Sequence, residues 1–188
     1  MTNEKILPHT YHSQRDNADD PSTPQVEAYV TCNVTSLSMA LSCLGIEIPP
    51  MELFKRANSP EYVAYAQQIG VAGFIKDKKL AQVWAILEKL ANEHCHAQFK
   101  TDWLTLQAIT DQIDAGNPIV VGGLFTHGGH IICIVGYNSL GFICTDPWGD
   151  WAHGYVNRNG DNVLYEYDKI RQVLSGNGSE FWSLVLKK

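Results

Sequence analysis

One segment organises this sequence, and it reads Thr31-Cys32-Asn33-Val34-Thr35-Ser36-Leu37-Ser38-Met39-Ala40-Leu41-Ser42-Cys43-Leu44-Gly45. Its apolar residues recur at three- and four-residue spacing, which predicts a helix with an apolar stripe on one face. The stripe consists of Val34, Leu37, Leu41 and Leu44. Gly45 ends the pattern, as is typical of the residue just beyond a helix C-terminus.

Cys32 stands at the N-terminal end of this predicted helix. The first helical turn leaves backbone N–H groups unsatisfied and the helix dipole is positive there, so both effects favour a thiolate over a thiol. A nucleophilic cysteine is therefore one interpretation of Cys32. The alternative is a small buried hydrophobic side chain, because free cysteine is among the most buried residue types.

The length and composition are those of an ordinary globular domain. The chain has 188 residues, of which 45% are hydrophobic and 18% charged. Its formal charge of −6 argues against a nucleic-acid partner, because no basic stripe is present. The five cysteines are odd in number and lack the spacing of a disulfide framework, so we expect a reducing compartment during synthesis.

The sequence shows no segment typical of export or of a membrane span. Residues 1–17 lack an apolar core of signal-peptide length, and no apolar run elsewhere approaches the length of a span. We therefore expect a protein that is cytoplasmic on synthesis and has no membrane partner. The sequence carries no signal for oligomeric state, so a monomer is the default expectation.

Helices are expected first along the chain, and strands later. Helical patterns occupy 51–70, 77–91, 104–115 and, between two strands, 168–175. In the helix over 77–91, Asp77 is the expected cap, and the expected inner face is Leu80, Val83, Trp84, Leu87 and Leu90. Strand patterns occupy 119–124, 130–137, 142–146, 163–167 and 181–186.

This order predicts an α+β domain, with a helical N-terminal half, a mostly antiparallel C-terminal sheet and a cleft between them. Residues 1–30 are rich in turn formers. We expect residues 1–188 to form a single domain, with residues 1–12 as a flexible lead-in.

His94-Cys95-His96 has the residue types of a metal site without the spacing of one. No Cys-x-x-Cys or His-x-x-x-His pattern accompanies it. We interpret it as the connection between a helix and a strand, and we expect neither a metal nor a cofactor.

Further candidate residues lie on a predicted hairpin whose tight turn is at 138–141. His130 opens its first strand and Asp146 closes its second, so both lie toward the same end of the ladder. Counting symmetrically about the turn places Cys133 opposite Asp146, so a contact with His130 requires twist, a bulge or side-chain reach. Taken singly, His130 could be a turn residue and Asp146-Pro147 a turn initiator.

Cys32, His130 and Asp146 together supply a nucleophile, a base and an acceptor that fixes the tautomer of the base. Such chemistry also needs donors for an oxyanion. The backbone N–H of Cys32 can supply one. An upstream side-chain amide, from Gln14 or Gln25, can supply another, and the sequence leaves that choice open.

Three motifs occur in a recognisable order. A helix-opening cysteine is followed by His130-Ile131-Ile132-Cys133-Ile134-Val135-Gly136-Tyr137 and then by Asp146-Pro147-Trp148-Gly149. This order resembles papain-like cysteine peptidases, which carry a His-(apolar strand)-Gly-Tyr segment and then Asn-Ser-Trp-Gly. Asp-Pro in place of Asn-Ser, together with Ser13-Gln14-Arg15-Asp16-Asn17 upstream, is more similar to the bacteriocin-processing (double-glycine leader) branch. The resemblance covers residues 11 to about 186.

The resemblance implies a papain-like fold and a role for each candidate. Cys32 is implied as the nucleophile and His130 as the general base and acid. Asp146 is implied to orient His130. Gln14 is implied as the side-chain donor to the oxyanion, with Gln25 as its rival.

Asn33, Gly129 and Trp148 are the candidate substrate-binding residues. Trp148 is expected to shield the His130–Asp146 hydrogen bond from water, or else to be a plain core aromatic. Asn33 departs from the glycine that many relatives carry after the nucleophile, where a glycine lets a substrate backbone approach closely. We interpret His127 as a loop residue.

The implied activity is hydrolysis of amide bonds by a cysteine peptidase. Stand-alone sequences with the Ser-Gln-x-Asp-Asn and Thr-Cys-Asn-Val-Thr-Ser patterns resemble phage endolysin domains. The expected substrate is therefore a peptidoglycan stem or cross-link peptide, reached after release from the cytoplasm through a separate pore. Two alternatives remain open. One is an intracellular peptidase or transpeptidase acting on a protein or small peptide, and the other is a binding module on an inactivated peptidase fold.

Overall fold

The computed structural model describes residues 4–19, 30–101, 105–174 and 182–188. Its helices are α1 (Cys32–Cys43), α2 (Pro50–Ala57), α3 (Pro60–Gln68), α4 (Trp84–Ala91), α5 (Leu106–Asp114) and α6 (Tyr167–Leu174). Its strands are β1 (Lys5–Ile6), β2 (His96–Lys100), β3 (Ile119–Gly123), β4 (His130–Tyr137), β5 (Gly141–Thr145), β6 (Val163–Glu166) and β7 (Ser183–Lys187). Short 3-10 turns are η1 (Gln14–Asp19), η3 (Ala72–Phe74), η4 (Leu80–Gln82) and η5 (Trp151–His153).

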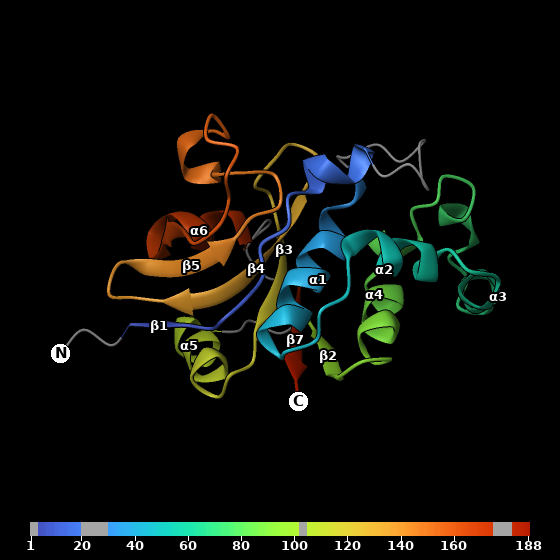
Figure 1. Cartoon of the computed structure of the whole chain (residues 1–188), viewed down its shortest axis with the longest axis horizontal. Helices are drawn as coiled ribbons and strands as arrows, with labels where there is room; N and C mark the ends of the chain where they lie inside the picture. Colours follow the sequence, from blue (N-terminus) through green and yellow to red (C-terminus); the bar gives the residue numbers. More distant parts are fainter. Residues whose placement is uncertain (1–3, 20–29, 102–104, 175–181) are drawn as a thin grey trace.

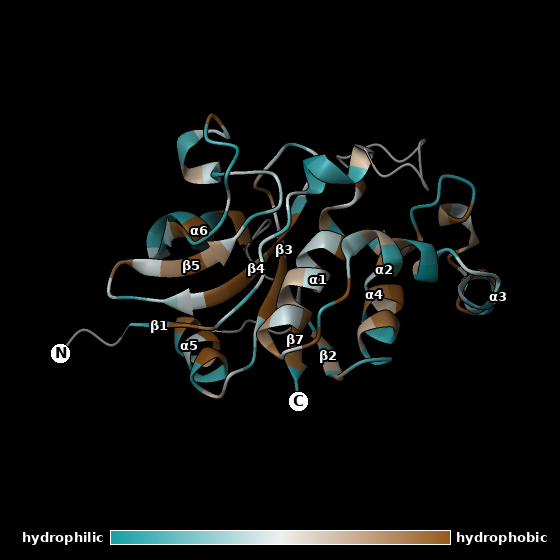
Figure 2. Ribbon diagram, viewed as in Figure 1, coloured by the Kyte–Doolittle hydropathy of each residue, from teal (hydrophilic) through white to brown (hydrophobic). Residues whose placement is uncertain are grey.

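The strands form one antiparallel sheet in the order β2-β7-β3-β4-β5-β6, with β1 added to β4. Helices cover both faces of this sheet (Figure 1). Alternate residues of a strand face opposite sides, so in β3 Val120 packs with α1, α2 and α4, whereas Val121 packs with α5 and α6. Figure 2 shows hydrophobic residues concentrated on the strands and on the adjoining helix faces. The α+β prediction is confirmed.

The helix α1 is buried all round rather than along one stripe. Every residue from 33 to 42 is buried, because β4 covers one side of the helix while α2 and α4 cover others. Its serines are hydrogen bonded in the interior: Ser36 Oγ donates to Ile131 O at 2.9 Å, and Ser38 Oγ donates to Ile48 O. A buried hydroxyl with a partner avoids the desolvation cost of an unpaired one, so a helix with this many polar residues can lie in the core.

The helix predicted over 77–91 begins seven residues late, at Trp84, so the prediction of Asp77 as its cap is wrong. Lys78 has a positive φ of 55°, and η4 follows it. Val83 is then extended, which separates η4 from α4. The apolar spacing therefore continues through a break in the helix, and it places Trp84 at the first position of α4.

The hairpin of β4 and β5 contains a β-bulge around Val135, where the register shifts by one residue. Because of this shift, Thr145 rather than Asp146 lies opposite Cys133. The position predicted for Asp146 by symmetric counting is wrong by one residue. The bulge moves Asp146 one position nearer to His130.

The predicted lead-in is attached to the domain from residue 5 onward. Lys5 and Ile6 pair with the end of β4, and Leu7 N–H donates to Val135 O at 2.8 Å. His9 Nε2 lies 2.9 Å from Oδ1 of Asp161, a residue 152 positions later in the sequence. We call residues 5–17 the N-terminal strap. Among the described residues, no helix combines the length and apolar character that a membrane crossing requires.

Candidate active site

Cys32, His130 and Asp146 meet where α1 and β4 begin and just beyond the end of β5. His130 Nε2 lies 2.8 Å from Asp146 Oδ1. The Cys32 side chain is within hydrogen-bonding reach of the same ring. Since Nε2 faces Asp146, Nδ1 is the ring nitrogen left for Cys32. The structure therefore brings together the three residues that the sequence analysis grouped.

The buried Asp146 carboxylate accepts hydrogen bonds on both oxygens. In addition to facing His130, Oδ1 accepts from the backbone N–H of Trp148 at 2.9 Å. Oδ2 accepts from the Tyr165 hydroxyl at 2.8 Å and lies 3.5 Å from the Tyr155 hydroxyl. Burial and the adjacent Asp146 charge raise the pKa of both phenols, so both stay protonated as donors. This set of bonds fixes which oxygen faces His130.

His130 is almost fully buried, and burial alone would lower its pKa. The hydrogen bond to Asp146 and the interaction with Cys32 outweigh that effect and raise the pKa of His130 to about 10. The aromatic rings of Phe125 and Tyr155 stand edge-on to the imidazole, with centroids at 6.4 and 6.2 Å. The arrangement favours a charged imidazolium beside Cys32, which is the form that stabilises a thiolate.

The chain's other four cysteines have a different environment. Burial raises the pKa of Cys43 to about 12 and that of Cys95 to about 11. Burial also raises the pKa of Cys133 and Cys144 well above the ordinary value. These thiols are protonated and inert near neutral pH.

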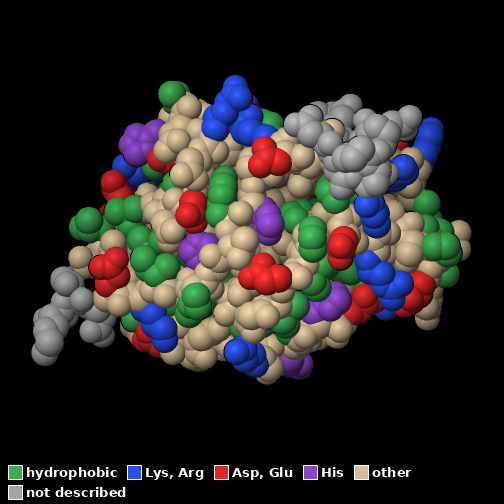
Figure 3. Space-filling model, viewed as in Figure 1, with side chains coloured by type: hydrophobic (Ala, Val, Ile, Leu, Met, Phe, Trp, Pro, Cys, Tyr) green, Lys and Arg blue, Asp and Glu red, His purple; other side chains and the backbone are tan. Residues whose placement is uncertain are grey.

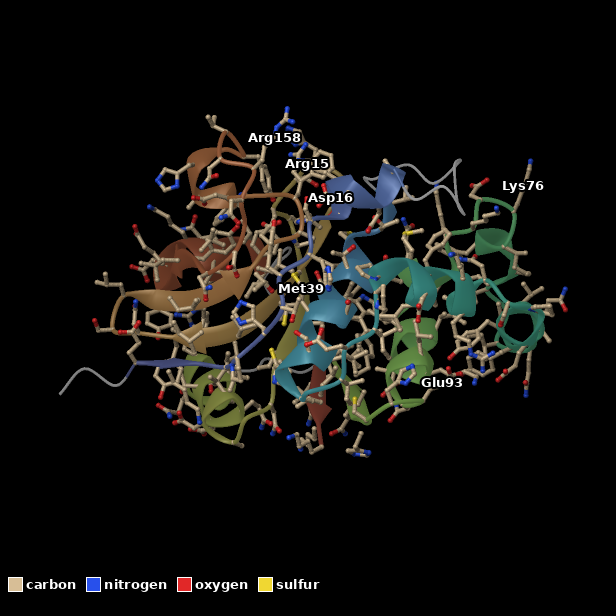
Figure 4. All side chains as sticks on the ribbon, viewed as in Figure 1. Arg15, Asp16, Met39, Lys76, Glu93 and Arg158 are labelled. Atoms are coloured by element: carbon tan, nitrogen blue, oxygen red, sulfur yellow. The ribbon has the colours of Figure 1, made fainter. Side chains whose placement is uncertain are left out.

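The N-terminal strap holds the loop that carries Asp146. The Tyr11 hydroxyl donates to Asp146 O at 3.2 Å, Gln14 N–H donates to Pro147 O at 2.9 Å, and Arg15 Nε donates to Trp148 O at 3.0 Å. The Arg15 guanidinium also lies 3.6 Å from the centroid of the Trp148 ring, a cation–π contact. Figure 4 shows Arg15 at the upper edge of the molecule. Three successive carbonyls of the loop are thus bound by one segment.

The strap also reaches the start of α1. Asn17 Nδ2 donates to Thr31 Oγ1 at 3.0 Å and to Thr35 Oγ1 at 2.8 Å. Gln14, at the beginning of η1, is buried. Its rival for the oxyanion role, Gln25, lies outside the described residues.

A cleft of about 950 Å³ opens beside Cys32 and His130. Its lining includes Cys32, Asn33, Gly129 and His130. His127, interpreted from the sequence as a loop residue, is also exposed on its rim. Asn33 is buried and its Oδ1 accepts from the N–H of Val34 at 2.8 Å, so its amide is bound to the helix start.

Trp148 is not among the described residues that line the cleft. Its ring lies beneath Arg15, and its N–H supports Asp146. The residues that sequence reasoning missed are Tyr11, Tyr155 and Tyr165, whose hydroxyls reach the Asp146 loop or its carboxylate. Tyr165 could have been suspected because a buried tyrosine needs a partner for its hydroxyl.

Comparisons with known proteins bear on the fold and on the family. No curated protein matches the sequence. A crystal structure of a protein from Bacillus anthracis, proposed to be a C39-like peptidase, has a similar fold with a TM-score of 0.59. The two are 16% identical over 99% of this chain and 98% of that one, so the similarity concerns the fold. The model of the Peptidase_C39 like family matches residues 6–174, and the chain therefore belongs to that family of cysteine peptidases.

Proposed function

We propose that this protein is a cysteine endopeptidase whose catalytic triad is Cys32, His130 and Asp146. The observation that carries the proposal is the position of His130, which contacts the Cys32 side chain through one ring edge and Asp146 through the other. A nucleophile, a base and an acceptor that orients the base are the parts that nucleophilic catalysis requires.

The reaction follows from these positions. The Cys32 thiolate attacks the substrate carbonyl carbon, and the carbonyl oxygen takes the negative charge. His130 gives its proton to the leaving amine as the C–N bond breaks, which leaves a thioester on Cys32. Water then loses a proton to His130 and attacks the thioester, which releases the carboxylic acid and restores the ion pair.

The oxyanion is stabilised by the backbone N–H of Cys32 and by the side-chain amide of Gln14 in this proposal. Cys32 is the first residue of α1, where N–H groups have no partner within the helix. Gln14 is supported by its place in η1, which Asn17 ties to the same end of α1. Donors held in advance at such a site contribute more than donors that must reorganise.

Two substrate classes are candidates. Resemblance to phage endolysin domains favours peptides of peptidoglycan, released as new amino groups from the wall. The size and the apolar walls of the cleft favour a polypeptide, because tryptophan and leucine side chains face its interior. The two candidates predict different products from the same enzyme.

The test uses purified peptidoglycan and, separately, a denatured protein mixture. Each is incubated with wild type, with Cys32→Ala and with Cys95→Ala, the last being a matched substitution of a partly buried thiol. We expect new amino groups from wild type and Cys95→Ala and none from Cys32→Ala. Release of as many amino groups by Cys32→Ala as by wild type would show that Cys32 is not the nucleophile. Release from only one material identifies the substrate class.

A further inference from the structure

The cleft extends away from the catalytic pair along the ends of three adjacent strands. In the register of β3 and β4, Gly123 lies opposite His130. On the far side of β3, the N–H of Gly122 donates to the carbonyl of Trp182, just before β7. All four residues line the same cleft. A substrate bound at Cys32 therefore has one continuous path across the sheet edge to Trp182.

Two tryptophans form the wall at the end of this path. Trp84 stacks on Phe99 with centroids 5.1 Å apart and an interplanar angle of 25°. Trp182 stands edge-on to Trp84 at 6.5 Å and 75°. Trp182 is 49% exposed and Leu124, on the same cleft, is 54% exposed. Trp182 and Leu124 thus present apolar side chains to solvent on one cleft, which is typical of a surface that a ligand covers.

A glycine seats the Trp84 ring. A Cβ at Gly122 would lie 3.0 Å from Trp84 Cζ2, closer than ordinary contacts allow. The missing side chain therefore lets the indole lie against β3, one residue from the position opposite His130. Adjacent strands are about 4.8 Å apart and an extended peptide advances about 3.3 Å per residue. A substrate side chain that packs against the two indole rings thus belongs to a residue within about three positions of the bond that is cleaved.

The charged groups of the cleft disfavour a positively charged occupant. Apart from the proposed Cys32–His130 pair, the described residues that line it include Lys79 and His127 as charged or chargeable groups, and no carboxylate. The face drawn in Figure 3, by contrast, carries acidic and basic side chains interspersed. A lysine or arginine side chain would enter the cleft without an acidic partner, and it would lose hydration there.

We propose that Trp84 and Trp182 form a subsite for an aromatic or bulky aliphatic side chain of an extended polypeptide, within about three residues of the bond attacked by Cys32. The inference rests on the proposed function, because Cys32 and His130 identify the occupant of the cleft as a substrate. Stem peptides of peptidoglycan are built of alanine, glutamate and a diamino acid, and they carry no side chain of this kind. The subsite therefore favours a protein or peptide substrate.

The test separates binding from catalysis by using the full chain with Cys32→Ala. Blocked alanine hexapeptides with a single Phe, Leu, Ala or Lys are titrated while tryptophan fluorescence is recorded. We expect the Phe peptide to bind at least about tenfold more tightly than the Lys peptide. Trp182→Ala, added to Cys32→Ala, is expected to remove most of this difference. Leu140→Ala, at an exposed apolar residue in the β4–β5 turn, is the matched control and is expected to preserve it.

Leu124→Asn is a second variant, which places a polar group on the rim without removing an aromatic ring, and it should also reduce the preference for Phe. Equal affinity for the Phe and Lys peptides, or a preference that survives both variants, would overturn the subsite. Selective binding without any Cys32-dependent cleavage by wild type would overturn the proposed function while the subsite stands.

Discussion

The two sides of His130 are built in opposite ways. On one side, Asp146 is buried and each carboxylate oxygen accepts hydrogen bonds from the surrounding loop and tyrosines. On the other side lies the cleft, where Leu124 and Trp182 are about half exposed. The hydrogen bonds on the polar side hold His130 and Asp146 in one geometry, whereas the apolar side provides contact area without directional bonds.

This difference matches the demands of the proposed chemistry. Proton transfer to and from Cys32 requires a ring placed within a fraction of an ångström, which a saturated hydrogen-bond network provides. Apolar burial is non-directional, so a cleft wall can accept several side chains of similar size. Mutations on the Asp146 side are therefore expected to affect the rate of chemistry, and those on the cleft side to affect the choice of substrate.

Asp146→Ala is expected to produce the largest loss on the polar side, about 10²–10⁴-fold in kcat. His130 loses the acceptor that orients it, and buried tyrosine hydroxyls lose their partner. Asp146→Asn retains an acceptor and should recover part of the rate. Steady-state kinetics on a protein substrate measures both, with exposed Asp77→Ala as control. Unchanged kcat in Asp146→Ala would show that His130 is oriented by other groups.

Gly160→Ala tests whether the position of Asp146 depends on the backbone behind it. The new Cβ would collide with the Asp146 carbonyl oxygen. The two residues also share a backbone hydrogen bond, from Asp146 N–H to Gly160 O at 2.9 Å. We expect about a 10²-fold loss in kcat from displacement of the carboxylate. Gly73→Ala is the matched control, because a Cβ there meets nothing within 4 Å. Similar rates for the two variants would contradict the expectation.

The pH dependence of stability tests whether the polar side of His130 holds the imidazole in its charged form. The pKa of His130 is raised from 6.5 to about 10, so its charged form stabilises the folded state. That stabilisation is complete below pH 6.5 and is lost as the pH rises through about 10. Urea unfolding at several pH values should show the free energy of unfolding falling more steeply for wild type than for His130→Gln. An equal fall in the free energy of unfolding for the two proteins would show that His130 is not charged in the folded state.

Tyr165→Phe removes the donor to Asp146 Oδ2 without changing the shape of the core. A buried acceptor that loses a partner costs about 1–3 kcal/mol of folding free energy. We expect a destabilisation in that range, with a smaller fall in kcat than for Asp146→Ala. Thermal unfolding and kinetics on the same preparations measure the two effects. A destabilisation without any change in kcat would show that Oδ1 alone sets the position of His130.

Gln82→Ala is expected to have the smallest effect. Gln82 lines the cleft and is exposed. We expect a change in stability within about 0.5 kcal/mol and no change in kcat. A loss comparable to that of Tyr165→Phe would show that the cleft wall is as constrained as the Asp146 side.

The sequence predicted the elements that periodicity controls. The helix that begins at Cys32 and the strand that begins at His130 are present where the patterns placed them, and β5 ends one residue before Asp146. Periodicity could not locate the bulge around Val135, because one extra residue within a continuous apolar run does not change the pattern. That one-residue shift determines how far Asp146 is from His130.

The tyrosines around Asp146 were missed for a related reason. In a strand pattern, Tyr165 counts as a hydrophobic residue, and nothing local shows that its hydroxyl faces a carboxylate 19 positions away in sequence. Trp84 was predicted as an inner-face residue of a longer helix, whereas the late start of α4 places it on the cleft. Both features depend on tertiary contacts that short-range patterns do not encode.

The N-terminal strap has a consequence for the time at which activity arises during synthesis. It binds residues far along the chain: Tyr11 contacts Asp146 and Gly160, and His9 contacts Asp161, across 135 to 152 positions. Such contacts close large loops and form late in folding. A nascent chain that ends before Asp146 holds Cys32 but not the loop that the strap secures. The strap can therefore hold the proposed catalytic residues together only after the segment through Asp161 has emerged from the ribosome.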